Sequence, residues 1–182
     1  MRFFVTPFSR AYWRTAAAEL RSTRMLSLAA LVIALRVALK SVVIPVGESL
    51  YISVAFLPNA LGSMVYGPVV ALIGGAASDV LGALLFPKGP FFPPFTLVEM
   101  LGSLLFALFL YRAPLKFWRI ALSKLSVNLF CNILLTPLFL AWMYGRAVVF
   151  TSLPRIAKNV LLFPLEALLL TLFLGAMLPV LR

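Results

Sequence analysis

The chain has 182 residues, of which 63% are hydrophobic and only 12% charged, and its formal net charge is +11. A soluble domain usually has about 25% charged residues, so the composition excludes an ordinary soluble fold and indicates a membrane protein. The absence of histidine excludes Ser-His-Asp and Cys-His catalysis, zincin motifs and histidine-ligated haem.

Two further observations narrow the function. No Gly-x-x-x-x-Gly-Lys-Ser/Thr sequence occurs, so no phosphate-binding loop for ATP is visible and any energy-driven activity needs a partner. The single cysteine, Cys131, excludes an intrachain disulfide and argues against a thiolate metal cluster. We assign no catalytic or metal-binding residue, although Asp79, Glu99 and Glu166 within apolar runs leave a membrane-embedded enzyme open as an alternative.

The N-terminal segment, residues 1–24, contains five arginines and few acidic residues. Residues 8–24 are predicted to form an amphipathic helix on the cytoplasmic membrane surface, with Phe8, Tyr12 and Trp13 toward lipid. A frayed tail is the alternative. A signal peptide is not expected, because no small-residue cleavage site follows an isolated apolar core.

Residues 25–182 are predicted to form one substrate-binding membrane domain. About 20 apolar residues cross a hydrocarbon core about 30 Å thick, and six runs approach or exceed that length, the second being short. They are residues 25–44, 52–66, 68–86, 93–111, 117–144 and 156–181. The predicted fold is therefore an all-α membrane protein with six transmembrane helices, since a barrel would show alternating ten-residue patterns instead.

The distribution of basic residues predicts the orientation. An even number of crossings places the N-terminal arginines, the 111–119 connection and Arg182 on one side, and Lys88, Arg146 and Arg155 on the other. The positive-inside rule then puts both termini in the cytoplasm. Because the basic residues are split among termini and loops, we expect a lipid bilayer and not a nucleic acid as the partner of this charge.

Polar residues recur at helical spacing inside the apolar runs. Charged and amide groups cost several kcal/mol in hydrocarbon unless they face a bundle interior or a watery cavity, so these stripes should look inward. They are Arg36 with Lys40; Asp79 beside small residues; Lys124, Asn128, Asn132 and Thr136; and Arg155, Asn159 and Glu166. The groups either neutralise one another, as Arg36 with Asp79 or Lys124 with Glu166, or line a solute-binding cavity, which accounts for more of them. Lys124 has the further alternative of snorkelling to headgroups.

Two other features point to contacts. Ala30, Ala34 and Ala38 form a small-residue ridge roughly opposite Arg36 on the first helix, suited to contact another subunit or a neighbouring helix of the same chain. Residues 86–95 are rich in proline and phenylalanine, which predicts a stiff, ring-bearing lid or rim, or else an interfacial anchor.

Three stretches resemble a known family. Residues 51–59 (YISVAFLPN), 66–71 (YGPVVA) and 78–87 (SDVLGALLFP) look like the folate-specific substrate-binding subunits, or S components, of energy-coupling factor (ECF) transporters. The six-span length, the alanine ridge and residues 132–136 and 155–166 are also similar. Related subunits take riboflavin, thiamine, biotin, pantothenate or queuosine precursors on the same scaffold, so another vitamin is the main alternative.

The resemblance implies a multi-pass protein of the cytoplasmic membrane that captures a vitamin from outside with high affinity. Such a subunit is not an enzyme and has no cofactor of its own. It docks on a transmembrane coupling protein (EcfT) and two ABC ATPases (EcfA and EcfA'), which use ATP, and the alanine ridge of the first helix would contact the coupling protein.

Folate chemistry can be matched to the polar and aromatic residues. A carboxylate or amide can accept from the pterin N–H edge, rings and guanidinium groups can stack on it, and cations near the mouth can hold the two carboxylates of the glutamyl tail. The candidate substrate-binding residues are Arg36, Tyr51, Asn59, Asp79, Phe92, Asn128, Asn132, Arg155, Lys158 and Glu166.

Overall fold

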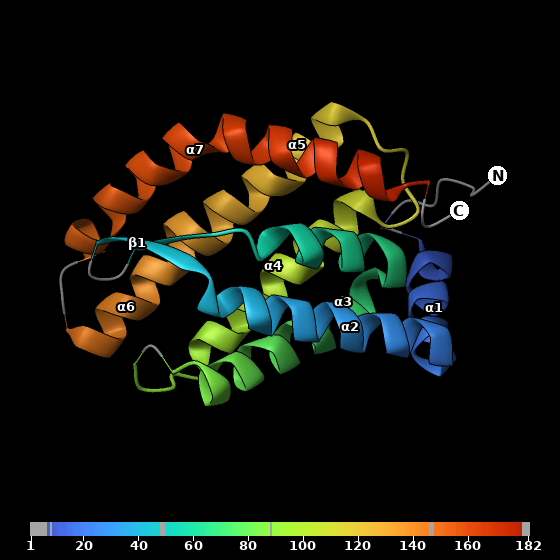
Figure 1. Cartoon of the computed structure of the whole chain (residues 1–182), viewed down its shortest axis with the longest axis horizontal. Helices are drawn as coiled ribbons and strands as arrows, with labels where there is room; N and C mark the ends of the chain where they lie inside the picture. Colours follow the sequence, from blue (N-terminus) through green and yellow to red (C-terminus); the bar gives the residue numbers. More distant parts are fainter. Residues whose placement is uncertain (1–6, 8, 48–49, 88, 146–147, 180–182) are drawn as a thin grey trace.

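The computed structural model describes residues 7, 9–47, 50–87, 89–145 and 148–179. In chain order the elements are α1 (Arg10–Ala18), the 3₁₀ turn η1 (Glu19–Arg21), α2 (Thr23–Ser41), β1 (Val43–Gly47), β2 (Leu50–Ser53), α3 (Phe56–Leu85), α4 (Pro94–Leu110), α5 (Phe117–Ser126), the π-helix η2 (Val127–Leu135), α6 (Thr136–Tyr144) and α7 (Val148–Met177). The longer helices run along the long axis of the molecule, and α1 crosses one end of it (Figure 1).

The first helix was predicted to extend to residue 44, and the structure corrects this. Helix α2 ends at Ser41, and β1 and β2 pair as antiparallel strands in which Ile44 lies opposite Ile52. Pro45 has no backbone N–H and favours an extended residue before it, and the preceding residues are β-branched. The described fold is therefore helical with one added pair of strands at the end opposite α1 (Figure 1).

Helix α3 is two helices joined at Gly67, whose φ of 79° and ψ of 179° are not helical. Asn59 and Gly75 would lie about 24 Å apart in a straight helix. Instead Ser103 reaches both: its hydroxyl lies 2.9 Å from the Asn59 side-chain oxygen and 3.0 Å from where a Cβ on Gly75 would sit. The two halves therefore run antiparallel, in agreement with the two separate runs predicted at 52–66 and 68–86.

The described helices and their surface are those of a membrane protein. Phe56–Leu85, Phe117–Tyr144 and Arg155–Met177 are long and apolar enough to span a bilayer, and α1 with α2, bent by 83°, passes if the pair is counted as one span. Helix α4 is also apolar but shorter, at 17 residues. Large apolar side chains such as Leu31, Leu84 and Leu161 are 68%, 72% and 77% exposed, which suits a lipid solvent.

Helix α1 caps the end of the bundle. Ser9 accepts a hydrogen bond from the backbone of Tyr12 at its N-terminus. The Tyr12 side chain is fully buried, donates to the carbonyl of Ala107 at 3.1 Å and meets the Tyr111 ring edge-on. Burial, followed by the nearby Tyr111, raises the pKa of Tyr12, so this phenol remains a neutral donor.

A helix is thus present in this segment, but it covers Arg10–Ala18 and not the whole of the predicted residues 8–24. The expectation that Tyr12 faces lipid is wrong, because its ring fills the space between α1 and α4. Trp13 does remain 40% exposed. Phe8, the third residue expected toward lipid, lies outside the described residues.

Candidate functional site

Two adjoining cavities lie inside the helix bundle. The inner one has a volume of about 210 Å³ and the outer one about 490 Å³. Small-molecule sites usually have volumes of about 300–1,000 Å³. The outer cavity falls within this range and the inner one lies below it. The residues that line both are Lys40, Ser53, Ala55, Val98, Glu99, Asn132 and Lys158.

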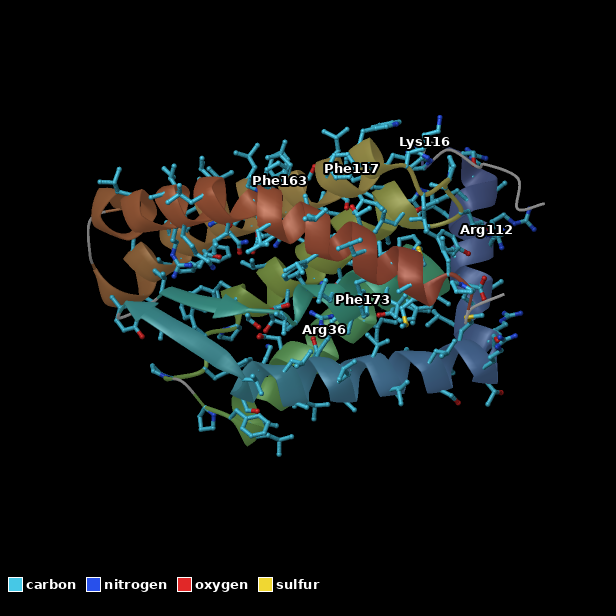
Figure 2. All side chains as sticks on the ribbon, turned by 45° about the horizontal axis from the view of Figure 1, so that its top comes forward. Arg36, Arg112, Lys116, Phe117, Phe163 and Phe173 are labelled. Atoms are coloured by element: carbon cyan, nitrogen blue, oxygen red, sulfur yellow. The ribbon has the colours of Figure 1, made fainter. Side chains whose placement is uncertain are left out.

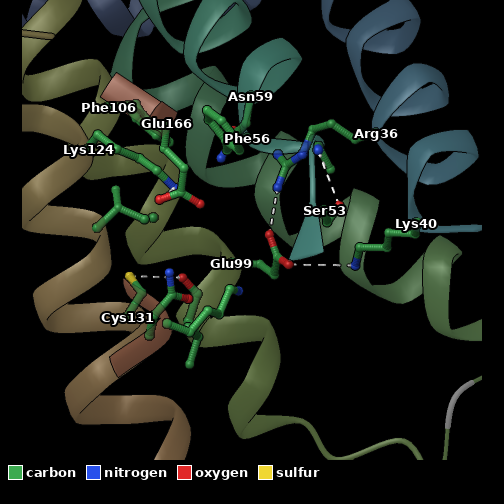
Figure 3. A pocket seen from close by; sticks show the side chains of 16 residues that line it. Arg36, Lys40, Ser53, Phe56, Asn59, Glu99, Phe106, Lys124, Cys131 and Glu166 are labelled. Atoms are coloured by element: carbon green, nitrogen blue, oxygen red, sulfur yellow. Dashed lines mark hydrogen bonds and ion pairs between the residues drawn. The ribbon is translucent and has the colours of Figure 1, made fainter. Parts of the chain in front are cut away.

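Glu99 on α4 is the centre of the first polar network. Its carboxylate lies 2.7 Å from the Arg36 guanidinium and 3.8 Å from the Lys40 ammonium (Figure 3). Arg36 is 2% exposed and also donates to the Ser103 hydroxyl, which donates in turn to Asn59 at 2.9 Å. Figure 2 shows Arg36 in the interior of the molecule. Helices α2, α3 and α4 are thereby joined at the cavity wall.

The pair of Lys40 and Asp79 extends this network toward the outer cavity. The Lys40 ammonium is 3.0 Å from Asp79, whose other oxygen accepts from the Thr96 hydroxyl at 2.8 Å. Lys40 can lie there because Gly82 has no side chain: a Cβ on Gly82 would sit 2.6 Å from the Lys40 stem. The small residues beside Asp79 thus admit a long cation from α2.

The second network joins α5, η2 and α7. Lys124, which is 3% exposed, lies 3.3 Å from the Glu166 carboxylate and 4.0 Å from the centre of the Phe56 ring. Asn128 donates to the same Glu166 oxygen at 3.1 Å, and Asn132 donates to Asn128 at 3.1 Å. The expected polar stripe is therefore present over these residues, and the alternative in which Lys124 snorkels to headgroups is wrong.

A π-helix precedes the last residue of that stripe. Thr136 follows η2, and its hydroxyl bonds the carbonyl of Cys131 five residues earlier, at 2.6 Å. Pro137 has no N–H and would clash with the carbonyl four residues before it in an α-helix, a strain that a wider turn relieves. Thr136 consequently lines the outer cavity while bonded to its own backbone.

Aromatic rings form the outer wall. Phe92 lies edge-on to Phe95 at 5.6 Å and to Trp142 at 5.4 Å between ring centres, and Phe95 meets Phe139 at 6.2 Å. Phe92 and Phe95 border the outer cavity together with Phe86 and Phe91. The phenylalanine-rich segment is therefore a rim over the cavity, as one of the two sequence interpretations predicted.

The cavities bring together most of the candidate residues that the sequence indicated. Their linings include Arg36, Asn59, Asp79, Phe92, Asn132, Arg155, Lys158 and Glu166. Asn128 lies behind the wall, 2% exposed, and supports Glu166 and Asn132. Tyr51 is in β2, but its side chain lies outside the described residues.

The ion pairs follow the sequence only in part. Lys124 pairs with Glu166, as one alternative proposed, whereas Arg36 pairs with Glu99 and not with Asp79. The candidate set also omitted Glu99, the carboxylate that both Arg36 and Lys40 approach. The sequence did contain a signal for Glu99: it is a carboxylate inside an apolar run, and Ser103 follows one helical turn later.

The cavities have a surplus of positive charge. Among the described residues their linings contain five cations (Arg36, Lys40, Lys124, Arg155 and Lys158) and three carboxylates (Asp79, Glu99 and Glu166). No group of three or more potential metal ligands of the His, Cys, Asp and Glu types occurs in that part of the chain. The arrangement therefore suits a planar organic anion: rings at the wall, amides and carboxylates for N–H groups, and cations for acidic groups.

A helical membrane protein with an interior cavity of this size and charge is a solute-binding membrane protein. A family model described as "ECF-type riboflavin transporter, S component" matches residues 20–178. A protein of Clostridium novyi named folate transporter FolT is 34% identical over 119 residues, covering 65% of this chain and 69% of the relative. FolT of Leuconostoc mesenteroides is 31% identical over 150 residues, covering 79% and 80%.

A solved structure is similar over most of the fold. The crystal structure of FolT bound with folic acid matches with a TM-score of 0.77 and 35% identity, covering 84% of this chain and 92% of that chain. The chain belongs to the S-component family of ECF-type transporters. Its family is therefore one of transporter subunits and not of enzymes.

Proposed function

We propose that this protein captures folate from outside the cell and delivers it to an ECF transporter as the S component. The observation that supports folate most directly is the surplus of two positive charges in the cavities. Folate has a glutamyl tail with two carboxylates, whereas riboflavin, the vitamin in the family description, has none. The relatives named FolT and the folic acid-bound neighbour support the same choice.

The lining suggests how the ligand is held. The pterin N–H edge would donate to Asp79, Asn59 or Asn132, and its ring would stack on Phe92, Arg36 or Tyr51. Arg155 and Lys158, on the outer part of α7, would bind the glutamyl carboxylates. Glu166, held by Lys124 and Asn128, would complete the inner end of the site.

A binding measurement tests this function. We expect the detergent-purified protein to retain a compound that absorbs in the near ultraviolet beyond the tryptophan band, and the ligand-free protein to bind labelled folate tightly. Asp79→Asn should weaken that binding about tenfold, because an amide accepts fewer hydrogen bonds than a carboxylate and leaves Lys40 without its closest partner. Unlabelled riboflavin should not compete. Tight riboflavin binding with no folate binding would reject the proposal.

Six crossings with both termini in the cytoplasm are part of the same proposal. The antiparallel halves of α3 would account for two of these crossings, where the helix length alone suggests one. Figure 2 shows Arg112 and Lys116 at the end of the molecule where α1 lies, which fits a common cytoplasmic side. Exposed Arg10 and Arg14 on α1 would then face anionic headgroups of the cytoplasmic membrane.

The alanine ridge is proposed to contact the coupling protein EcfT, which assembles with the ATPases EcfA and EcfA'. Ala30, Ala34 and Ala38 are all exposed on α2, which favours a contact with another subunit over one with a helix of the same chain. A row of small residues lets the backbone of another helix approach closely.

A single bulky substitution tests that contact. Ala34→Trp should leave folate affinity within about twofold, since Arg36 and Lys40 face the other way, but should abolish folate uptake and co-purification with the coupling protein. The matched control is Ala157→Trp, at an exposed alanine of α7. Folate uptake by Ala34→Trp as high as that of the Ala157→Trp control would show that the coupling contact lies elsewhere.

A further inference from the structure

Asn132 occupies the junction of the two cavities, since it lines both. An asparagine amide can present either its NH₂ group or its carbonyl oxygen to a ligand, and the surrounding hydrogen bonds decide which. The orientation of the Asn132 amide is fixed by two independent chains of hydrogen bonds, one through Asn128 and one through Asn159.

Along the first of these hydrogen-bond chains the orientation begins at Glu166. A carboxylate only accepts hydrogen bonds, and this one lies 3.3 Å from Lys124. Asn128 must therefore present its NH₂ group to Glu166, which it does at 3.1 Å. Its carbonyl oxygen is left facing Asn132, which can approach it only as a donor, at 3.1 Å.

Along the second hydrogen-bond chain the orientation begins at the backbone. The carbonyl of Arg155 also only accepts, and Asn159 donates its NH₂ group to it at 2.8 Å. The oxygen of Asn159 then faces Asn132 and accepts from its NH₂ group at 3.3 Å. Both hydrogens of the Asn132 amide are thereby used, and its carbonyl oxygen is what it can offer to a ligand.

We propose that the Glu166–Asn128 and Arg155–Asn159 hydrogen bonds lock Asn132 as a hydrogen-bond acceptor, so that this position selects ligands presenting an N–H donor. Asn128 is then a positioning residue for specificity, because it is 2% exposed, lines neither cavity and acts only through its neighbours. The inference rests on the proposed function in naming its ligand class, a planar heterocycle with an amino or ring N–H edge.

The test compares ligands that differ only in that edge. Three ligands are titrated into the purified full-length protein: folic acid, its 2-desamino analogue and its 4-amino analogue. The 2-desamino analogue lacks the amino donor. In the 4-amino analogue the ring N–H becomes an acceptor and the neighbouring carbonyl becomes an amino donor. We expect the wild-type protein to bind at least one analogue about 30-fold more weakly than folic acid, because a fixed acceptor is left without its donor or faces a second acceptor.

Variants of Asn128 separate positioning from packing. Asn128→Asp keeps an acceptor toward Asn132. The ratio of the affinity for folic acid to the affinity for the more weakly bound analogue should therefore stay within about twofold of the wild-type ratio, even if repulsion from Glu166 lowers stability. Asn128→Leu removes the acceptor, and Asn128→Ser substitutes a hydroxyl that both donates and accepts. Asn128→Leu and Asn128→Ser should each lower this affinity ratio at least threefold. The double variant Asn128→Leu with Asn159→Leu should lower it further.

The outcomes are distinguishable. Weaker binding of all three ligands by the same factor in Asn128→Leu and Asn128→Ser would overturn the inference and leave Asn128 a packing residue, while folate capture stands. Lack of discrimination by the wild-type protein would also overturn it. Failure of the wild-type protein to bind folic acid at all would overturn the proposed function, and this inference with it.

Discussion

Gly67→Ala should lower the midpoint of thermal unfolding in detergent by roughly 6–12 °C, the equivalent of about 3 kcal/mol for a chain of this size. Gly67 has φ 79° and ψ 179°, a region of backbone conformation that is essentially restricted to glycine and costs other residues about 1–3 kcal/mol. A Cβ there would also lie 2.9–3.1 Å from three ring atoms of Tyr111, which is itself buried. Tyr12 packs edge-on against this ring and opposes its displacement.

The effect should extend to ligand binding. Gly67 joins the two halves of α3, of which the first positions Asn59 and the second Asp79, so displacement of the turn changes their spacing across the cavities. We expect weaker folate binding and an unfolding midpoint that folate raises more in the wild-type protein than in the variant.

Gly175→Ala is the matched control. This glycine lies in α7, and a Cβ there meets no atom within 4 Å. Alanine in a helix interior is favoured over glycine by roughly 0.5–1 kcal/mol, so the unfolding midpoint should stay the same or rise slightly. Equal midpoints for Gly67→Ala and wild type would show that the turn at Gly67 is not constrained as the structure indicates.

Arg36→Met should reduce folate affinity about a hundredfold, or about 2.8 kcal/mol. The substitution keeps an unbranched apolar stem but removes the guanidinium that bonds Glu99 at 2.7 Å and Ser103 at 3.2 Å. Breaking a buried ion pair by removing one partner leaves an uncompensated charge, which is more costly than losing the pair. Isothermal titration of folate, with thermal unfolding of the ligand-free protein in parallel, measures both effects.

A double variant separates a ligand contact from charge neutralisation. Arg36→Met combined with Glu99→Gln removes both charges, so the stability of the ligand-free protein should recover while folate affinity stays low. Recovery of affinity in the double variant would mean that Arg36 only neutralises Glu99. Arg36→Lys should lose about tenfold, because an ammonium keeps the charge but not the planar fork that reaches two partners.

The membrane class, the apolar runs and the inward polar stripes could be predicted from the chain alone. Burial in hydrocarbon is a property of each segment's own composition, since a span must satisfy its backbone internally and present apolar side chains over its whole length. For the same reason the candidate residues, which lie on five separate runs and their connections, were expected to converge, and the cavity linings contain eight of the ten. The proposed vitamin came from the resemblance of three stretches to folate-specific subunits and not from composition.

The tertiary structure decided which groups meet. Arg36 pairs with Glu99 and Lys40 with Asp79 because α3 reverses at Gly67 and α4 packs beside it, and helical spacing within one run contains no information on the distance to another. The pairing of β1 with β2, the π-helix before Thr136 and the burial of Tyr12 also depend on local backbone strain or on contacts distant in sequence. Hydropathy is a sum over neighbouring residues, whereas an ion pair or a hydrogen bond depends on atoms a few ångströms apart, and only the packed helices set those distances.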